Sequence, residues 1–567
     1  MQEQNRHYFY SYLAVSRAAK STGVSVYDQI LAWKGAVAGR QTFLRAMRRD
    51  LHDQPQTLKI YTDLQDATRQ LGKLINLVPK EGQRDAHQKR LADLSDSVES
   101  LQQKLAGASA AFAEQRQQQR RTTAVLQQSL PAGTALVDIL EYSHFGYVRD
   151  LDKRPVWKHR YTAFVLRRDK PIVWIDLGLA IEPIIAIQTW RKTYGQGTEA
   201  EQAAAKLRKD IWEPLQEALV GANTVLISPD GALSKFPFAA LPGEKPGTYL
   251  IEERSIAVIP FPQMLPELLS RKKDDAKKSP ASLLLVGDVD YGGDSGVMLA
   301  SAEAHRGERA VRDGKVVWGP LKGTRTEIDA IRDCFERHFS KGKANQLSDK
   351  EATHQAVHEQ AIKNRFLHFA THGFFADASV KSLSAPKDRP ENELFRENSR
   401  APIVGNHPGL LSGIVLTGAN QPAADDKDDG ILTALEVGEL DLDGVELATL
   451  SACETGLGKT AGGEGLLGLQ RAFQLAGAKT TVASLWKVPD QATKSLMVRF
   501  YGNLWSGKMS KLDALLNAQR WLLNEGKQHP ELYRGLESAD ASADTVRQDG
   551  RLTPRYWAAF ILSGDWR

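Results

Sequence analysis

The sequence predicts an α/β protein with an all-helical N-terminal region. About the first 130 residues are poor in proline and place apolar residues at helical spacing. The rest of the chain alternates short β-rich runs with helical stretches. In its last part the apolar runs are continuous, which is typical of parallel strands buried on both faces. With 567 residues, the chain is long enough for several cores and is not one small domain.

Residues 1–130 are predicted to form the helical region. Its clearest signal is one stripe with steps of three and four between apolar positions: Leu91, Leu94, Val98, Leu101 and Leu105. Because this pattern lasts only about two heptads, an intramolecular helical hairpin is favoured over an intermolecular coiled coil. We find no convincing repeat of about 34 residues, so the sequence does not demonstrate a tetratricopeptide array.

Residues 131–275 are predicted to form a first α/β unit. Proline and glycine after Leu130 end the helical pattern, and five β-rich runs follow: ALVDILEY, YTAFVL, PIVWIDLG, NTVLISPDGAL and RSIAVIP. A helix predicted over Thr198–Val220 favours an α/β layer over a β-sandwich. The charged stretch Arg271–Pro280 is interpreted as a solvated linker, because acidic residues interrupt its basic run.

Residues 276–567 are predicted to form a second α/β domain. Helices predicted over Thr326–Phe339 and Glu464–Ala476 alternate with four strand-like runs: SLLLVGD, RFLHFATHG, ELATLSACETG and TTVASLW. The interval Ala376–Gln421 and the acidic tract Ala424–Gly430 predict a long mobile loop followed by a short helix. Chemistry in parallel sheets gathers beyond the carboxyl ends of the strands. The residues at these ends are Asp288, His372 and Cys453.

Composition and charge exclude several classes of protein. Hydrophobic residues make up 42% and charged residues 25% of the chain, which excludes wholly disordered and fibrous proteins. The net charge of +5 is too slight to indicate nucleic-acid or membrane partners, so neither DNA nor membrane binding is expected. Two cysteines exclude a disulfide framework. Without a signal-peptide pattern or an apolar run of about 18 residues, we expect a cytoplasmic protein.

Cys453 and His372 have the clearest potential for chemistry. Cys453 follows a buried strand and precedes a glycine-rich turn, whereas Cys334 lies on the apolar face of a predicted helix, where a thiol is inert. A nucleophilic cysteine needs exposure, a base and backbone N–H groups for an oxyanion. His372 ends another strand and can supply the base, and Gly373 leaves room for a substrate carbonyl. Taken alone, this pair is weak support for catalysis.

Several longer segments of the sequence together resemble a known protein family. The segments are LISPDGALSKFPFAAL, LKGTRTEI, LHFATHGFF, GILTALEVGELDLDGVELATLSACETGLG, GEGLLGLQRAFQLAGAKTTVASLWKVPDQATKSLMVRFYGNL and YWAAFILSGDW. Together they closely resemble the CHAT family of caspase-like proteases, over about Leu130 to Arg567. The most specific parts are the His-Gly and Ser-Ala-Cys-Glu-Thr-Gly blocks, which occur in the expected order.

The resemblance implies a caspase-hemoglobinase fold with a His372–Cys453 dyad, preceded by a catalytically silent α/β subdomain over 131–275. Separase is similar in this arrangement. Family members usually carry tetratricopeptide repeats upstream, and residues 8–119 look like the helical connector that follows such repeats. The chain thus resembles the C-terminal part of a longer protein. Relatives occur with prokaryotic immune or cell-death systems, including RNA-guided effectors and gasdermins.

The expected function is a cysteine endopeptidase that needs no metal or organic cofactor. Cys453 attacks the peptide carbonyl, His372 handles the proton, and the N–H groups of Gly373 and Cys453 hold the oxyanion. The expected partners are a protein substrate, such as a gasdermin, and an activating protein, such as an RNA-guided effector complex.

Acidic residues near strand ends are candidates for the pocket that binds the residue before the scissile bond. Similar proteases with basic specificity carry an acidic residue there, and a carboxylate favours Arg or Lys by charge pairing. Each candidate also fits a helix N-cap or a solvated loop. The candidates are Asp288, Asp290, Asp490 and Glu454.

A zinc site is a weaker alternative. His354 and His358 are four residues apart, as are His368 and His372, but neither pair has the Glu that a zinc protease places after its first His. On one strand, His368 and His372 would lie about 13 Å apart, too far to chelate one ion.

Two further alternatives concern function. The segment CETGLGKT matches the phosphate-binding G-x-x-x-x-G-K-[ST] pattern except at Cys453, and nucleotide binding would then use Lys459. The competing class is a non-enzymatic pseudoprotease scaffold whose helices recruit partners.

Overall fold

The structure is a computed structural model of the chain. It describes residues 2–19, 23–34, 55–76, 84–108, 122–147, 155–270, 280–292, 310–312, 315–321, 323–375, 412–421, 429–451, 458–461, 465–525, 528–532, 547 and 549–567. Within these residues, the chain begins with helices only: α1 (Gln2–Ala18), α2 (Gly23–Trp33), α4 (Pro55–Asn76), α5 (Arg84–Ala108) and α7 (Thr123–Ser129).

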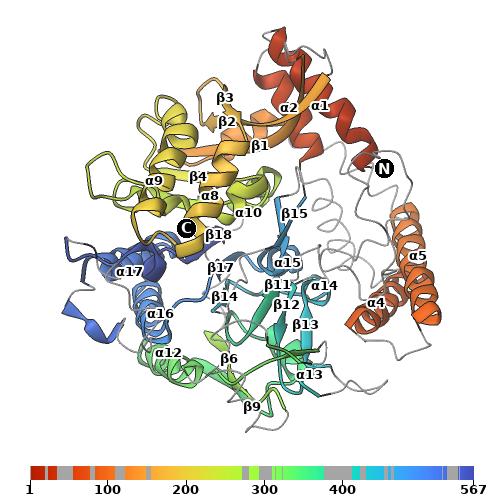
Figure 1. The fold of residues 1–567 in the computed structure, drawn as a ribbon. Coiled ribbons are helices and arrows are strands. Elements are labelled where there is room, and N and C mark those ends of the chain that lie inside the picture. Colours follow the sequence, from red (N-terminus) through yellow and green to blue (C-terminus); the bar gives the residue numbers. More distant parts are fainter. Residues whose placement is uncertain are drawn as a thin grey trace.

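A mixed sheet of 11 strands runs through the α/β part of the chain (Figure 1), in the order β3-β2-β1-β4-β5-β18-β17-β14-β10-β6-β9. Its first part contains β1 (Thr134–Tyr147), β2 (Pro155–Arg167), β3 (Val173–Leu179), β4 (Thr224–Ser228) and β5 (Ser255–Val258). Its second part contains β6 (Ser282–Val289), β9 (Lys343–Asp349), β10 (Phe366–Ala370), β14 (Leu447–Leu450), β17 (Thr480–Ser484) and β18 (Phe560–Gly564). Strand β18 lies between β5 and β17, so the end of the sequence joins the two parts.

The second part of the sheet is parallel from β9 to β17, and β18 is antiparallel to β17. Helices cover both of its faces. On β6, Leu283 and Leu285 belong to one core, and the alternate residues Leu284 and Val286 belong to the other. The first core includes α12 (Thr324–His338), α16 (Asp490–Trp505) and α17 (Lys511–Glu525), and the second includes α13 (His354–Ala361) and α15 (Leu469–Ala476). Burial on both faces explains the continuous apolar runs of the sequence.

Smaller elements surround this sheet. The first part carries α8 (Ile181–Thr193), α9 (Thr198–Leu207) and α10 (Leu265–Ser270). In the second part, β11 (Gly373–Phe375), β12 (Ser412–Val415) and β13 (Ile431–Thr433) form a three-stranded sheet that leads into α14 (Ala434–Val437). Two hairpins also occur, β7 (Ala310–Arg312) with β8 (Lys315–Val317) and β15 (Gly458–Ala461) with β16 (Gly465–Gly468), and α18 (Pro554–Trp557) precedes β18.

The α/β class with N-terminal helices is confirmed, and three predicted elements need correction. The helix predicted from Glu464 begins only at Leu469, because the glycine-rich residues before it pair as β16. The helix predicted over Thr198–Val220 is an α-helix only to Leu207 and continues as a π turn and a 3₁₀ turn that contains Pro214, which has no N–H to donate.

The interval predicted as a long loop contains the strand β12, and the short helix expected after it is α14. Residues 376–411 and 422–428 of that interval lie outside the described residues, so its mobility stays a prediction.

The N-terminal helices pack in two ways. Residues of α1 and α2, such as Leu13 and Ile30, belong to the same core as the first part of the sheet. Helices α4 and α5 lie side by side (Figure 1), and Leu64 of α4 packs with Val98 and Leu101 of the predicted apolar stripe. The stripe therefore contacts another helix of the same chain. No helix among the described residues is long and apolar enough to cross a membrane.

A buried ion pair joins α2 to the sheet. Lys34, at the end of α2, pairs with Asp138 of β1, and both side chains are almost fully buried. The Lys34 ammonium also donates to the carbonyl oxygens of Ile139 (2.8 Å) and Ser228 (3.2 Å), and the Tyr27 hydroxyl donates to Asp138 (2.9 Å). Each charge is thus surrounded by hydrogen-bond partners.

Replacing Asp138 by Ala should lower the free energy of unfolding by about 3–5 kcal/mol, because it leaves the Lys34 ammonium buried without its counter-ion. Urea denaturation measures this loss. The control Lys206→Ala breaks an exposed pair with Asp210 (3.2 Å) and should change stability little. A loss for Asp138→Ala no larger than that of the control would contradict the buried ion pair.

Candidate active site

The candidate site lies where three neighbouring parallel strands end. Strand β10 pairs with β6 on one side and with β14 on the other, so their carboxyl ends meet at one edge of the sheet. His372 follows β10, and Ser451 follows β14. Cys453 comes two residues after Ser451 in the chain, and it lies outside the described residues together with Glu454. The pairing of β10 with β14 thus brings the chain segments before both predicted dyad residues together.

The His372 ring is held in one orientation. Its Nε2 lies 2.7 Å from the carbonyl oxygen of Gly319. A carbonyl oxygen only accepts hydrogen bonds, so Nε2 carries the proton of the neutral ring and Nδ1 keeps the lone pair. The rings of Tyr291 and Trp318 flank the imidazole at centroid distances of 5.1 and 5.4 Å.

The pKa of His372 is lowered to about 4, mainly because the ring is buried. The hydrogen bond to Gly319 opposes this shift, and the positive charge of Lys487 contributes to it. The imidazole is therefore neutral at neutral pH. A neutral imidazole with a free lone pair on Nδ1 is able to take a proton from a thiol.

Gly373, predicted to form part of the oxyanion hole, is the first residue of β11. It lies opposite Ile414 of β12, and the neighbouring Val415 N–H donates to the His372 carbonyl at 2.9 Å. In this antiparallel arrangement, Gly373 and Ile414 form a non-hydrogen-bonded pair. The Gly373 N–H consequently points away from β12, as an oxyanion donor would.

Two of the acidic candidates are engaged in local structure. Asp288 ends β6 with a positive φ of 55° and lies 3.6 Å from the Arg325 guanidinium, and both side chains are about half exposed. The Asp290 carboxylate accepts the N–H of Gly292 at 2.9 Å, and the Asp290 backbone bonds to Asp349. Asp290 therefore shapes the turn after β6.

Asp490, the third described candidate, is the first residue of α16 and accepts a hydrogen bond from the backbone of Gly323. Burial raises the pKa of Asp490, while Lys487 lowers it and the charge of Glu327 raises it. Lys487 also acts on His372. Asp490 and the histidine therefore share Lys487 as a charged neighbour.

The sequence analysis missed a buried carboxylate beneath this edge. Glu327 of α12 is only 4% exposed. One of its oxygens accepts from the Ser451 hydroxyl at 2.7 Å and lies 3.1 Å from His368 Nε2. The segment that leads to Cys453 is thereby tied to α12. Glu327 lies in LKGTRTEI, which the analysis used only for family resemblance.

The same network extends along the sheet. His368 of β10 is fully buried, and its Nδ1 lies 3.1 Å from the Tyr501 hydroxyl of α16. Tyr501 in turn donates to the Thr449 hydroxyl of β14 at 2.8 Å. Three elements, α12, β10 and α16, therefore hold the end of β14 through hydrogen bonds.

The alternative sites do not fit the described geometry. His368 is engaged in this network, and the described residues contain no group of three His, Cys, Asp or Glu side chains that could hold a metal. A P-loop needs a helix directly after its Lys, but Lys459 belongs to β15 and α15 begins at Leu469. Cys334 is buried, as predicted, and burial raises its pKa.

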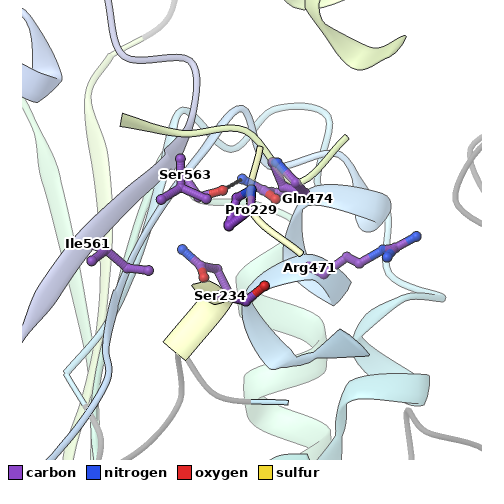
Figure 2. Close-up of a pocket in the computed structure, with 9 residues that line it drawn as sticks. Pro229, Ser234, Arg471, Gln474, Ile561 and Ser563 are labelled. Carbon is purple, nitrogen blue, oxygen red and sulfur yellow. Dashed lines mark hydrogen bonds between the residues drawn. The ribbon is translucent and has the colours of Figure 1, made fainter. Parts of the chain in front are cut away.

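A small pocket lies elsewhere, between the two parts of the sheet (Figure 2). It is lined by residues such as Ser234, Arg471 and Ile561, and Gln474 donates to Ser563 across it at 3.0 Å. Its volume of about 30 Å³ has room for ordered water. None of the groups around His372 lines it, so this pocket is not the candidate active site.

The fold and site define an α/β protein with a neutral, oriented histidine at the carboxyl edge of a parallel sheet. The family model described as the CHAT domain matches residues 201–565, which is more than half of the chain. The chain therefore belongs to the CHAT domain family, as its sequence motifs indicated.

Comparisons with individual proteins add relatives. The chain is 26% identical over 321 residues to tetratricopeptide repeat protein 28 of Homo sapiens, and 26% over 315 residues to that of Mus musculus. Each match covers 54% of this chain but only 11% and 12% of the relative. The chain thus matches about a tenth of the length of these curated relatives.

Two solved structures are also similar. One is the Arg-specific cysteine proteinase gingipain R, with 10% identity, a TM-score of 0.35 and coverage of 68% of this chain and 74% of that one. The other is the separase–securin complex of Saccharomyces cerevisiae, with 11% identity, a TM-score of 0.30 and coverage of 90% and 27%.

The lowered pKa of His372 predicts how stability depends on pH. The ordinary pKa of the unfolded state is near 6.5 and that of the native state is about 4, so between these pH values the native state binds fewer protons than the unfolded state. The free energy of unfolding is therefore fully retained, as far as His372 is concerned, above pH 6.5. It falls as the pH is lowered towards 4, by up to ~1.4 kcal/mol per pH unit.

Urea denaturation between pH 7 and pH 4.5 tests this effect. His372→Ala should lose less stability on acidification than the wild type, whereas the control His358→Ala, at an exposed position, should keep the wild-type slope. Equal slopes for His372→Ala and the wild type would show that His372 titrates normally.

Proposed function

We propose that the protein is a cysteine endopeptidase with Cys453 as nucleophile and His372 as base. The observation that carries the proposal is the hydrogen bond from His372 Nε2 to Gly319, which leaves Nδ1 to accept a proton. Membership of the CHAT family and the chain order of His372 and Cys453 support the same assignment.

The proposed reaction follows from this arrangement. The Cys453 thiol gives its proton to His372 Nδ1, and the sulfur forms a bond to the substrate carbonyl carbon. The N–H groups of Gly373 and Cys453 stabilise the oxyanion. The C–N bond then breaks as the imidazolium protonates the leaving amine, which leaves a thioester on Cys453. Water, deprotonated by His372, hydrolyses the thioester and restores the thiol.

A basic residue before the scissile bond is the proposed specificity. Asp490 is the candidate carboxylate for this pocket, because the positive charge of Lys487 acts both on Asp490 and on His372. A carboxylate in a partly buried site pairs with Arg or Lys more strongly than it would in water.

Activation by a protein partner is a further part of the proposal. Helix α4 of the N-terminal region contacts α14, which directly follows β13 of the small sheet that carries Gly373. A partner that binds the helical region could therefore shift strands next to His372. An RNA-guided effector complex as activator and a gasdermin as substrate are proposals from the family resemblance.

Cleavage of a diverse peptide library, read by mass spectrometry, tests the proposed reaction. The wild type should cut the library, alone or with lysate of the source cell, because a partner in the lysate can activate it. Cys453→Ala should abolish cutting with an almost unchanged melting temperature, and the control Cys334→Ala should keep it. Cuts that persist in Cys453→Ala would refute the nucleophile, and a total absence of cuts would favour the scaffold.

The proposed specificity has its own test. Asp490→Asn should reduce cleavage after Arg and Lys by roughly 10- to 100-fold, the range expected for loss of a hydrogen bond to a charged group. Cleavage at other residues should change less. Asp288→Asn is the matched control and should keep the wild-type preference. An unchanged preference in Asp490→Asn would assign the pocket to another residue.

A further inference from the structure

We infer that Asn420 is a positioning residue for the base, because it fixes the backbone that orients His372. The inference rests on the proposed function. Asn420 lies in the interval between His372 and Cys453 that the sequence predicted to be a loop. It acts on the imidazole through the backbone of Trp318 and Gly319.

Asn420 binds both chain segments that flank His372. Its Oδ1 accepts the Trp318 N–H at 2.8 Å, and its Nδ2 donates to the Trp318 carbonyl at 2.8 Å. Nδ2 also donates to the Gly292 carbonyl at 3.0 Å, and the Asn420 N–H donates to the Tyr291 carbonyl at 2.9 Å. One side chain thus matches both polar backbone groups of Trp318, which requires an acceptor and donors on a short arm.

The consequence for His372 follows from chain connectivity. Gly319 comes directly after Trp318, and its carbonyl accepts the His372 Nε2–H. A glycine backbone has more conformational freedom than that of other residues, so this carbonyl needs a restraint to keep its direction. Asn420 supplies that restraint one residue away. Without it, the ring could take the other tautomer and lose its proton-accepting Nδ1.

Asn420 is itself firmly anchored. In the same turn, the Thr417 hydroxyl donates to the Asp349 carbonyl at 2.7 Å, and the Gly418 N–H donates to the Asp290 carbonyl at 3.3 Å. Asp349 ends β9, and Asp290 directly follows β6. The turn is therefore fixed to the ends of two strands of the main sheet, and Asn420 transmits this fixed frame to Gly319.

The test measures alkylation of Cys453 by iodoacetamide, followed by peptide mapping, between pH 5 and pH 9. The His372-dependent part of the rate is the excess of the wild type over His372→Ala. Asn420→Ala should lose most of this excess, at least about tenfold, because a misplaced base is ineffective. Its pH profile should then coincide with that of His372→Ala.

The matched control is Asn364→Ala. Asn364 is a buried asparagine of the same half, and its side chain likewise accepts and donates: it accepts from Asn345 (3.1 Å) and donates to Gln360 (2.8 Å). This variant should keep the wild-type profile, because a general loss of hydrogen bonds does not change the proton acceptor. Labelling of the buried Cys334 reports unfolding in every sample.

Each outcome decides a separate point. A wild-type profile in Asn420→Ala would overturn the positioning role and leave the proposed function standing. Coincident profiles of the wild type and His372→Ala would overturn both. If Cys334 labelling shows that Asn420→Ala is unfolded, Asn420→Asp takes its place, since it keeps the acceptor for Trp318 and loses the donors. The pH profile of Cys453 alkylation in Asn420→Asp is then compared with those of the wild type and His372→Ala, and the same two outcomes apply.

Discussion

The hydrogen bond between His372 Nε2 and the Gly319 carbonyl is the constraint on which the candidate site depends. A neutral imidazole has one donor and one acceptor nitrogen, so an acceptor group that binds one nitrogen leaves the other nitrogen to accept a proton. Burial keeps the ring neutral. The proton-accepting nitrogen is therefore selected by the backbone, and no carboxylate is needed to orient the ring.

The rest of the fold keeps the groups around this bond in place. Helices on both faces of the parallel strands bury the apolar side chains of β6, β10 and β14, so the strand ends have little freedom. Glu327 of α12 then binds both Ser451, the residue after β14, and His368 of β10. Strand β18, joined to β5 and β17, makes the first part of the sheet continuous with this frame.

The sequence predicted the parallel core because period and composition are local signals. Continuous apolar runs separated by helices mark buried parallel strands, and His372 at a strand end follows from the same pattern. The partners of His372 are not local. Gly319 and Asn420 lie 53 and 48 residues away, in segments without periodicity, and a backbone carbonyl has no sequence signature. The sequence did not predict the role of Glu327 for a related reason, since a Glu on an amphipathic helix usually faces solvent.

Crystallographic analysis of the protein inactivated by an electrophilic peptide tests the central claim most directly. The account predicts the adduct on Cys453, with its sulfur within hydrogen-bond reach of His372 Nδ1 and with Nε2 on the Gly319 carbonyl. The sulfur far from the imidazole, or beside Nε2 with the Gly319 bond broken, would contradict it.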